Sequence, residues 1–434
     1  MKTVNIGLCG LGTVGGGTFN VLARNSAEIQ ASANCQVKVS HVGVRRDNPA
    51  FDLSGVKVSK DIFDVVNDPG VDIVVEMIGG TTVAKDLVLQ AISNGKHVVT
   101  ANKALIAEFG GEIFSAAEKK NVCVAFEAAV AGGIPIIKVL REGLAANKIE
   151  WLAGIINGTG NFILTEMAQK GREFADVLKQ AQKLGYAEAD PTFDVEGIDA
   201  AHKLVILTSI AFGIPLQFES VFTEGISKIE PQDLSYAKEL GYRVKHLGVA
   251  RRHGNKVEMR VHPTLIPEKR LMAHVNGVMN AVMVNGDAVG STLHSGPGAG
   301  AEPTASSVIA DIVDIARELA EGTTPSVPHL GFSANYVSSL TIQPMSELET
   351  GYYLRINVED KPGVLSNITE IFSRMGVSIE AVIQKEAEDD EATVQLILLT
   401  NKAIEGKMMQ AINEIETLGA VTGQVAYIRV ETLQ

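Results

Sequence analysis

Continuous apolar runs alternate with helical apolar spacing over the first 130 residues of the chain. A run such as Lys2 to Cys9 suits a strand that is buried on both faces, and the stretch after it has the apolar spacing of a helix. Strands that alternate with helices predict an α/β fold with a mostly parallel sheet. The predicted strands are 2–9, 37–44, 71–77, 96–100 and 122–125, and the predicted helices are 16–24, 84–94 and 105–119.

The middle of the chain has a different pattern, in which long helices precede alternating strands. This pattern predicts an α+β catalytic and dimerisation domain with an open, mixed sheet. A glycine-rich stretch at 295–303 is expected to be a loop, and the helix after it, at about 304–320, is expected to return to the first domain. The predicted strands are 149–156, 243–251, 256–262 and 278–284, and the predicted helices are 162–170, 173–184, 199–212 and 304–319.

The pattern is interrupted and then restarts near the end of the chain. Residues 321–350 contain three prolines and little periodicity, as a linker would. Beyond them, strands at 352–359, 377–384, 392–400 and 424–430 alternate with helices at 364–375 and 402–416. This βαββαβ order predicts a ferredoxin-like module. The expected domains are therefore 1–130, 131–320 and 351–434, with 321–350 as the linker.

The first strand runs directly into a glycine fingerprint, Gly10-Leu-Gly12-Thr-Val-Gly15, and a helix follows. In this order, Gly10 permits a tight turn, Gly12 lets the backbone approach a pyrophosphate, and Gly15 allows close packing of helix and strand. The helix N-terminus then faces the phosphates. The sequence therefore predicts a dinucleotide-binding domain.

The end of the second strand bears on which dinucleotide binds. Arg45 and Arg46 follow this strand and precede Asp47, and Lys57 comes shortly afterwards. An acid at this point bonds the ribose of NAD, whereas arginine accommodates the 2′-phosphate of NADP. The pattern favours NADP and leaves NAD open, and two exposed arginines without a ligand are the alternative.

An acidic loop from Gly185 to Lys203 leads into an apolar helix. Asp199 and Lys203 are four residues apart, so they share one face of that helix and are able to pair. A lysine beside carboxylates is suited to proton transfer, because burial and neighbours set its pKa. The alternative is an acidic helix start with one surface ion pair.

Two further segments are candidates for ligand contacts. Lys103 lies at the carboxyl end of a predicted strand, where open α/β sheets bind ligands, although lysines at such ends are often simply solvated. The loop Glu127–Pro135 is apolar except for its glutamate. It is suited to present carbonyl oxygens and Glu127 to a hard cation, and tight packing at a domain crossover explains it equally well.

Composition narrows the class of protein. A chain of 434 residues allows two or three domains, and a net charge of −13 disfavours nucleic acid and anionic membranes as partners. No apolar run approaches the roughly 18 residues that a membrane span needs, and no signal peptide is expected before the first strand. Three scattered cysteines, Cys9, Cys35 and Cys123, fit neither a disulfide framework nor a zinc site. A reducing cytoplasm is the expected location.

The first 320 residues closely resemble homoserine dehydrogenase. Five motifs follow one another in the order of that family: 10–15, 100–103, 127–135, 154–161 and 185–203. The C-terminal module resembles an ACT domain, which binds amino acids at paired interfaces, since Asp360-x-Pro-Gly363 and Asn367 match its ligand loop. No aspartate kinase domain precedes the fingerprint, so the chain resembles the regulated, single-activity form.

The resemblance implies an activity and its partners. The implied reaction is the NAD(P)H-dependent reduction of L-aspartate 4-semialdehyde to L-homoserine, a step towards threonine, methionine and isoleucine. An amino-acid effector, with threonine as the leading candidate, is implied at the ACT domain. A sodium ion and a homodimer or homotetramer are also expected.

The resemblance also assigns roles to individual residues. Lys203 is the implied general acid, Asp199 holds it and the substrate, and Lys103 contacts both nicotinamide and substrate. The implied substrate residues are Glu188, Asp199, Thr159 and Tyr186. The implied cofactor residues are Gly10, Gly12, Thr13, Val14, Gly15, Arg45, Arg46, Lys57, Lys103, Gly185 and Gly300. The implied sodium ligands are Glu127 and the carbonyls of Val130, Gly132 and Ile134.

Two rival functions fit parts of the sequence. An aldehyde-oxidising semialdehyde dehydrogenase would need a thiolate nucleophile, and Cys123, within a predicted strand, is the remaining candidate for it. A non-catalytic sensor could bind a nucleotide at one end and an amino acid at the other. Such a sensor has no need for the set of Lys203, Asp199 and Glu188.

Overall fold

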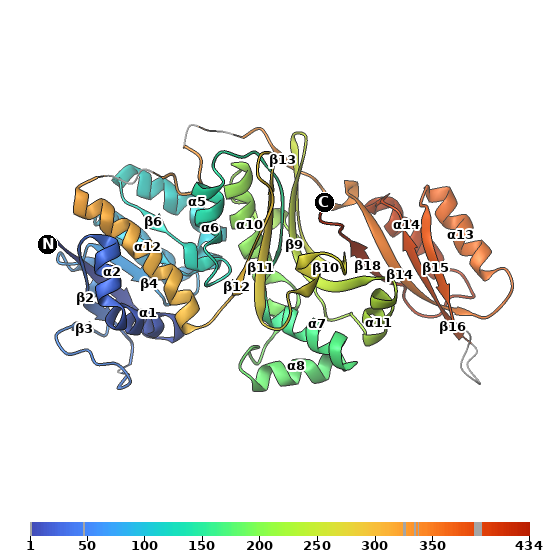
Figure 1. Ribbon diagram of the computed structural model, residues 1–434, viewed down its shortest axis with the longest axis horizontal. Coiled ribbons are helices and arrows are strands. Elements are labelled where there is room, and N and C mark those ends of the chain that lie inside the picture. The colour runs from blue at the N-terminus through green and yellow to red at the C-terminus, as the bar shows by residue number, and fades with distance from the viewer. Residues whose placement is uncertain (1, 47, 324–326, 334–335, 337, 386–392) are drawn as a thin grey trace. The chain divides into compact units, whose positions relative to one another are not determined.

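The computed structural model describes residues 2–46, 48–323, 327–333, 336, 338–385 and 393–434 (Figure 1). The chain forms two compact units, each built from three segments. The first unit comprises Met1–Ile156, Ala201–Val221 and Met279–Leu340, and the second comprises Asn157–Ala200, Phe222–Val278 and Thr341–Gln434.

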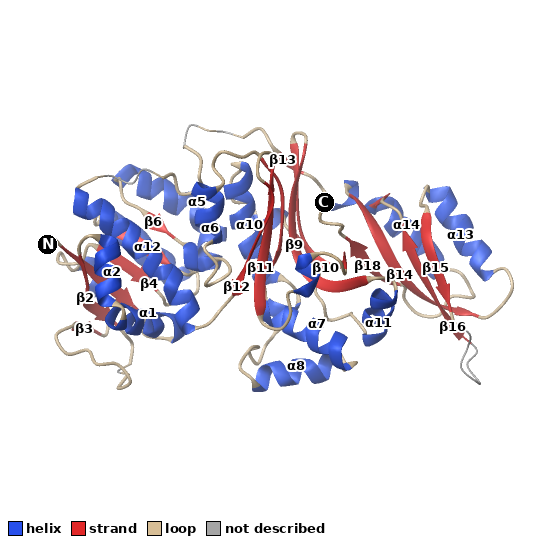
Figure 2. Ribbon diagram, in the orientation of Figure 1, coloured by secondary structure: helices blue, strands red, loops and turns tan. Residues whose placement is uncertain are grey.

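The first unit contains a six-stranded parallel sheet with the order β3-β2-β1-β4-β5-β6. Its central strands are fully buried because helices cover both faces (Figure 2). This arrangement confirms the predicted Rossmann-type sheet. The strands are β1 (Thr3–Cys9), β2 (Gln36–Gly43), β3 (Lys57–Ser59), β4 (Ile73–Glu76), β5 (His97–Thr100) and β6 (Val124–Ala125).

One of the helices that cover this sheet comes from much later in the chain. Helix α12 (Ala301–Glu321) packs against α1 (Thr13–Arg24), and its apolar face joins the core under β1. The two helices approach closely at Gly17, where a Cβ atom would lie 2.4 Å from the carbonyl oxygen of Ala301. The other helices of this layer are α2 (Ser26–Ala33), α3 (Phe63–Asn67), α4 (Thr82–Ser93) and α5 (Lys103–Lys120).

Three antiparallel strands complete the first unit, in the order β12-β11-β7. They are β7 (Ile149–Ile155), β11 (Met279–Gly286) and β12 (Gly290–Pro297). The loop predicted at 295–303 is therefore wrong in its first part. The strand continues to Pro297 because Met279 to Gly286 supply a full set of antiparallel partners, and only three residues separate it from α12.

The second unit begins with helices α7 (Gly158–Lys170), α8 (Phe174–Lys183) and α9 (Thr192–Val195). A long hairpin follows, made of β9 (Tyr242–His253) and β10 (Lys256–Pro267), with α11 (Pro231–Glu239) preceding it. The long helix α10 (Ile198–Phe212) starts after α9 and carries Asp199 in its first turn, and from Ala201 onward it belongs to the first unit. The sequence predicted α10 to within one residue at its start.

The C-terminal module has the predicted βαββαβ order. It consists of β14 (Glu349–Glu359), α13 (Val364–Met375), β15 (Ile379–Gln384), β16 (Thr393–Thr400), α14 (Glu405–Glu416) and β18 (Ala426–Val430). These strands form an antiparallel sheet with the order β18-β14-β16-β15. The interval 321–350 includes a two-residue strand, β13 (Thr341–Ile342), which pairs with β10.

The sheet of this module continues into the hairpin of the second unit. Strand β18 pairs in parallel with β10, with Thr264 opposite Arg429 and Leu265 opposite Val430. One hydrophobic core spans this joint: Tyr353, Leu399 and Ile428 pack with buried residues of α7 and α11. The module is therefore joined to the rest of the second unit by both main-chain pairing and shared apolar packing.

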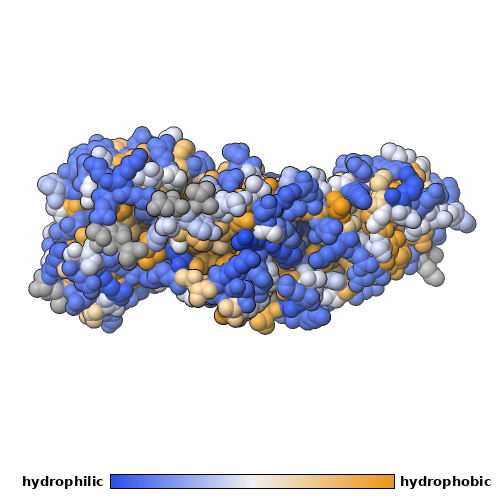
Figure 3. Space-filling view, turned by 90° about the horizontal axis from the view of Figure 1, so that it is seen from above, coloured by the Kyte–Doolittle hydropathy of each residue, from blue (hydrophilic) through white to orange (hydrophobic). Residues whose placement is uncertain are grey.

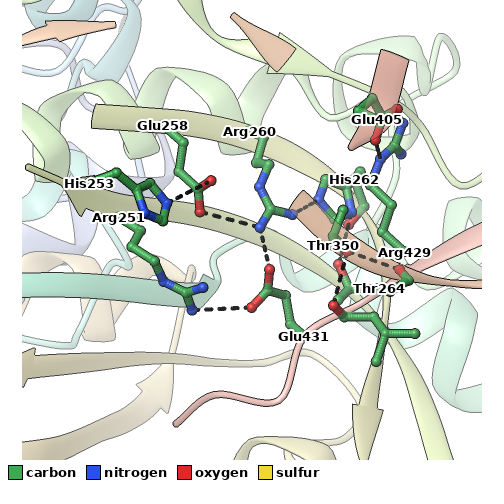
Figure 4. A network of polar contacts seen from close by, with 12 residues as sticks. Arg251, His253, Glu258, Arg260, His262, Thr264, Thr350, Glu405, Arg429 and Glu431 are labelled. Carbon is green, nitrogen blue, oxygen red and sulfur yellow. Dashed lines mark hydrogen bonds and ion pairs between the residues drawn. The ribbon is translucent and has the colours of Figure 1, made fainter. Parts of the chain in front are cut away.

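A network of buried charges lies beside the same joint (Figure 4). The guanidinium of Arg260 contacts Glu431 and lies 3.3 Å from Glu258, and Arg251 reaches Glu431 at 3.2 Å. Arg429 bonds Glu405 through Nε at 2.9 Å. Arg260 and Arg429 are both buried, with 1% of their surface exposed. The positive charge of Arg260 is balanced by Glu258 and Glu431, and that of Arg429 is balanced by Glu405.

The visible face of the molecule is mostly hydrophilic, with small hydrophobic areas scattered over it (Figure 3). Scattered apolar side chains of this kind are normal on a protein surface. Among the residues that the structure describes, no helix is both long and apolar enough to cross a lipid bilayer.

Replacing Arg260 with methionine should destabilise the joint between β10 and the C-terminal module. The change removes the cation from two buried carboxylates, and breaking a buried pair costs about 3–5 kcal/mol. We expect the urea unfolding transition, followed by circular dichroism, to move to lower urea. The control is Arg374→Met, which removes an exposed pair with Glu414 and should cost at most about 1 kcal/mol. Equal shifts for the two variants would contradict a stabilising role for the network.

Candidate functional site

A cavity of about 430 Å³ lies at the carboxyl ends of the first strands of the parallel sheet. The glycine turn forms one wall: Gly10 has a φ of 101°, and a Cβ at Gly15 would lie 2.0 Å from the Gly10 carbonyl oxygen. Around Gly12 there is open space, so a ligand is able to approach its backbone. The geometry matches the role of each glycine in a dinucleotide-binding turn. The cavity is lined by Gly10, Leu11, Gly12, Gly43, Val44, Arg45, Arg46, Asn48, Ile62, Met77 and Ile78.

Arg45 and Arg46, the two arginines that follow the second predicted strand, line this cavity. Arg45 and Arg46 are both exposed there, and Asp47 lies outside the described residues. Lys57 is placed differently: its ammonium lies 2.9 Å from the Asp68 carboxylate and lowers the pKa of that carboxyl to about 2. The charge of Lys57 is therefore largely balanced within the protein, whereas Arg45 and Arg46 face the cavity.

Glu76 is a structural residue of this site that the sequence analysis did not single out. Its buried carboxylate ends β4, accepts a bond from Thr100 Oγ1 at 2.6 Å, and accepts two more from the N–H groups of Ile78 and Gly79. It thereby fixes the turn that forms the cavity wall at Met77 and Ile78. An acid at the end of an apolar strand was the signal that could have identified it.

Lys103 is the first residue of α5, directly after the carboxyl end of β5. The preceding Asn102 caps the helix by accepting a bond from Leu105 N at 3.1 Å. Its Nδ2 also donates to the Gly80 carbonyl at 2.6 Å, which links the ends of β4 and β5. Lys103 is thus held at the edge of the sheet where the sequence placed it.

Lys203 is buried within α10, with 9% of its surface exposed. Its ammonium donates a 2.7 Å hydrogen bond to the carbonyl oxygen of Ile156, just after β7 ends. Burying a lysine disfavours its charged form unless acceptors compensate, and this carbonyl is one such acceptor. The bond fixes the position of Nζ next to the start of the Asn157-Gly-Thr-Gly segment.

In the second unit, Asn157 connects the two acidic segments of the sequence motif. Its Nδ2 donates to Asp194 Oδ1 at 2.8 Å and to Asp199 Oδ2 at 2.9 Å. Its Oδ1 accepts from Gly160 N at 2.7 Å and so caps α7. Asp199 is buried, and the amide of Asn157 holds its carboxylate in place. The sequence motif contained Asn157, but nothing in its spacing indicated this bridging role.

Of the remaining predicted substrate residues, Tyr186 and Glu188 lie on the loop after α8, and Thr159 lies in the first turn of α7. Thr159 Oγ1 donates to the Tyr186 carbonyl at 2.6 Å, which ties the loop to the first turn of α7. Tyr186 and Glu188 are exposed, and Gly185 has a φ of 75° where the helix ends. An exposed carboxylate at Glu188 is suited to bind a cationic group from solvent.

The buried carboxylate of Glu127 is bound by the start of a short helix. Its two oxygens accept from Ile137 N at 2.8 Å and Lys138 N at 2.9 Å, while its own N–H donates to Asp311 at 2.8 Å. Burial raises the pKa of Glu127 to about 7, and burial beside Glu127 raises the pKa of Asp311 well above its ordinary range. The carbonyl of Gly132, in the same loop, already accepts a bond from Ser307.

Three comparisons with known proteins bear on this site. Family models match residues 10–127 as "Homoserine dehydrogenase, NAD binding domain", residues 135–313 as "Homoserine dehydrogenase" and residues 352–417 as "ACT domain". A homoserine dehydrogenase of Pseudomonas aeruginosa is 61% identical over 433 residues, which cover 100% of both chains. The chain belongs to the homoserine dehydrogenase family.

Solved structures of homoserine dehydrogenases agree with this assignment. The enzyme from Thiobacillus denitrificans has a TM-score of 0.95 and 58% identity, with 100% of this chain and 99% of that chain covered. A hyperthermophilic archaeal homoserine dehydrogenase, solved in complex with NADPH, has a TM-score of 0.61 and 26% identity, with 72% of this chain and 97% of that chain covered. The predicted family, the predicted ACT domain and an oxidoreductase that acts on a CH–OH group with a nicotinamide cofactor are confirmed.

The alternative function of an aldehyde-oxidising semialdehyde dehydrogenase needs a thiolate nucleophile, and Cys123 is not suited to this role. Burial raises the pKa of the Cys123 thiol to about 12, so the group stays protonated and unreactive at neutral pH. Cys9 and Cys35 are buried as well. Interconversion of a carbonyl and an alcohol needs only hydride and proton transfer, so an oxidoreductase that acts on a CH–OH group requires no cysteine nucleophile.

Cofactor preference provides a test of the cavity. The double variant Arg45→Ala/Arg46→Ala should weaken NADP binding at least about tenfold, because hydrogen bonds to charged groups contribute about 1.5–3 kcal/mol each. NAD has no 2′-phosphate, so its dissociation constant should change little. Lys57→Ala is the control and should affect both cofactors weakly, since Lys57 pairs with Asp68. Equal losses for NAD and NADP, measured by fluorescence titration, would refute the assignment of the arginine pair.

Proposed function

We propose that this protein catalyses the NAD(P)H-dependent reduction of L-aspartate 4-semialdehyde to L-homoserine. The observation that carries the proposal is the buried ammonium of Lys203, which donates to the Ile156 carbonyl and lies one helical turn along α10 from Asp199. The names of the relatives are consistent with this substrate pair. The reaction would belong to the biosynthesis of threonine, methionine and isoleucine.

In this proposal Lys203 acts as the general acid. The glycine turn, with Arg45 and Arg46, would hold NADPH or NADH, and this cofactor would supply the hydride. The carbonyl oxygen of the substrate gains negative charge during the reduction, and the ammonium at Nζ both stabilises this charge and donates a proton to it. Ile156 positions Nζ through the 2.7 Å bond, so the ammonium is oriented before the substrate arrives.

The acidic segment would bind the amino-acid part of the substrate. Glu188 is exposed and would attract the substrate ammonium, while Asp199, held by Asn157, would bind it from the start of α10. Thr159 and Tyr186 would shape the pocket, and Gly185 and Gly300 would contact the cofactor, with Gly300 at the start of α12. Lys103 would contribute a second polar contact to nicotinamide and substrate.

Removing the proposed acid should reduce turnover. Lys203→Ala should lower kcat by about 10²–10⁴, the usual contribution of a general acid, and should leave cofactor affinity nearly unchanged. Lys96→Ala is a matched control, because Lys96 is also buried and donates to two main-chain carbonyls, of Asp68 and Val71. A fall in kcat of less than about tenfold for Lys203→Ala, or an equal fall for Lys96→Ala, would refute the assignment of Lys203 as the general acid.

We also propose a sodium ion at the loop that follows Glu127. Two carboxyl groups, Glu127 and Asp311, are buried together, and a bound monovalent cation would balance their charge. The carbonyls of Val130, Gly132 and Ile134 would be the other ligands, although Gly132 and Ile134 already accept one hydrogen bond each. Oxygen ligands of this kind suit a hard cation, which would support the fold and not enter the chemistry.

Sodium binding should depend on pH in a definite direction. The pKa of Glu127 is about 7 in the folded protein and 4.5 ordinarily, so its contribution to stability is fully present below 4.5 and is lost as the pH rises through 7. A cation binds the ionised carboxylate and restores this loss. NaCl should therefore raise Tm, relative to tetramethylammonium chloride at equal ionic strength, more at pH 8 than at pH 5.5.

The control for this measurement is Glu127→Gln, which keeps the shape of the side chain and removes its charge. Its Tm should respond equally to the two salts at either pH. A sodium effect that is the same at both pH values in the native protein, or that persists in Glu127→Gln, would exclude Glu127 as a ligand.

We also propose that an amino acid regulates the enzyme through the C-terminal module, and threonine is the leading candidate. The module belongs to a family that binds amino acids, and threonine is a downstream product of the proposed reaction. Strand β15 ends the strand order among the described residues, so a second copy of the chain could pair with this edge and form a dimer or a tetramer. We place the enzyme in the cytoplasm, where its proposed pathway would operate.

A further inference from the structure

A small cavity of about 120 Å³ lies within the second unit. Its walls come from α7, α11, β9 and the short 3₁₀ helix η4 (Leu271–His274). Sites for drug-sized ligands measure about 300–1,000 Å³, so a cavity of this size suits a few water molecules or a small ion. None of the described residues that line it is an aspartate or a glutamate. The polar residues of the lining are Thr165, Gln169, Arg243, Lys245, His274 and Asn276.

Lys245 brings a buried positive charge to this cavity, with 3% of the residue's surface exposed. Its Nζ donates to the carbonyl oxygen of Val275 at 2.5 Å and to Oδ1 of Asn276 at 3.1 Å, and Oδ1 of Asn161 lies 3.4 Å away. All three acceptors are uncharged. They therefore provide hydrogen bonds to the ammonium without balancing its charge.

The pKa of Lys245 is consistent with the lack of a counter-charge. Burial, together with the nearby charge of Arg243, lowers this pKa to about 8, and no carboxylate among the described residues opposes the shift. Lys96 is also buried and bonded to main-chain carbonyls, but the charges of Asp68 and Asp72 oppose the effect of burial on its pKa. Buried ammonium groups are ordinarily paired with an anion, and Lys245 has none in the described part of the chain.

Other groups that line the cavity add donors and a second positive charge. Arg243 binds Glu268 Oε1 through Nε at 3.2 Å and Nη2 at 2.7 Å, which leaves its Nη1 without a hydrogen-bond partner among the described residues. The side-chain NH₂ groups of Asn276 and Gln169 and the imidazole of His274 likewise make no hydrogen bond with a residue that the structure describes. A guanidinium, two amides and an imidazole around a buried ammonium suit an anion with several acceptor oxygens.

We propose that this cavity binds a small oxyanion, such as phosphate, sulfate or a short carboxylate. Lys245 supplies the counter-charge from the buried side of the cavity. Arg243, Asn276, Gln169 and His274, which are half-buried or exposed, donate hydrogen bonds from the solvent side. The inference does not rest on the proposed reaction, because none of these residues belongs to the proposed catalytic set.

The buried side of the cavity is attached to the start of α7. Asn161, whose Oδ1 faces Lys245, donates through Nδ2 to the carbonyls of Val275 at 3.1 Å and Gly277 at 3.0 Å. Thr165 Oγ1 accepts from Gly277 N at 3.1 Å. These bonds fasten the turn after η4 to α7, with the Lys245 ammonium among them. An oxyanion that balances this charge therefore stabilises the attachment.

A thermal-shift titration of the full-length protein tests the site. Tm is measured against increasing phosphate, sulfate or acetate, with potassium chloride adjusted to hold the ionic strength constant. Saturating NADP is present, so that the arginine pair of the dinucleotide cavity is occupied. An anion that binds the folded protein raises Tm along a saturating curve, whereas an anion that is only excluded from the protein surface raises it without saturation. We expect saturation with at least one of the three anions, and those that saturate identify the class of the ligand.

Two variants remove the positive charges of the cavity. Lys245→Met keeps the apolar stem of the side chain and should raise the dissociation constant of the anion at least about tenfold, as expected when a charged donor is lost. Arg243→Met should have an effect of similar size. Arg243 is only half-buried, so this variant remains informative if Lys245→Met does not fold.

Lys238→Met is the matched control. Lys238 lies on α11 close enough to Glu268 to lower the pKa of that carboxyl slightly, after the larger effect of Arg243, but it does not line the cavity. Its removal changes the net charge by the same amount, and the dissociation constant should stay at the native value.

Three results would overturn the inference. The first is the absence of a saturating curve for all three anions with the native protein. The second is an unchanged dissociation constant in Arg243→Met or in folded Lys245→Met. The third is an equal loss in Lys238→Met, which would indicate a general effect of charge and no defined site. The measurement follows stability and not turnover, so each of these results leaves the proposed reaction untouched.

Discussion

The hydrogen bond between the Lys203 ammonium and the Ile156 carbonyl is the interaction on which the proposed chemistry depends. The bond forms where β7 ends. The residue after the acceptor is Asn157, whose side-chain amide donates to the carboxylates of Asp194 and Asp199. A buried lysine without a fixed acceptor would lose its proton or move. Two consecutive residues thus make these bonds: Ile156 accepts from the acid, and Asn157 donates to the carboxylates.

Buried ion pairs also connect the C-terminal module with the rest of the second unit. The ACT-type sheet is not merely connected to the second unit by a chain segment: β18 pairs with β10, and Arg260, Arg429 and Arg355 are neutralised by carboxylates at this joint. Such pairs contribute little net stability compared with apolar packing, but they allow only one register.

The sequence predicted the elements of the parallel sheet and the βαββαβ module well, since buried strands and amphipathic helices have periods that local sequence reveals. It also placed Lys203 and the glycine turn on the correct elements, whereas Lys103, expected at the end of a strand, is the first residue of α5. It did not predict the strand up to Pro297, whose glycines conceal pairing with β11, or the pairing of β18 with β10. The bridging role of Asn157 and the three bonds to Glu76 depend on residues that only the folded chain brings together, so no local pattern encodes them.

The parallel pairing of Thr264 with Arg429 has a consequence for the order of folding. Strand β18 is synthesised long after β10, so Thr264 and Leu265, the residues of β10 that pair with it, lack this partner until β18 is available. Contacts between residues so distant in sequence form slowly, because closing the intervening loop costs entropy before any contact compensates for it. During this interval the nascent chain presents an unpaired strand and the apolar surface around Leu265, which are features that molecular chaperones recognise. The assembly of the second unit is thus expected to be the step at which newly made chains are most exposed to aggregation.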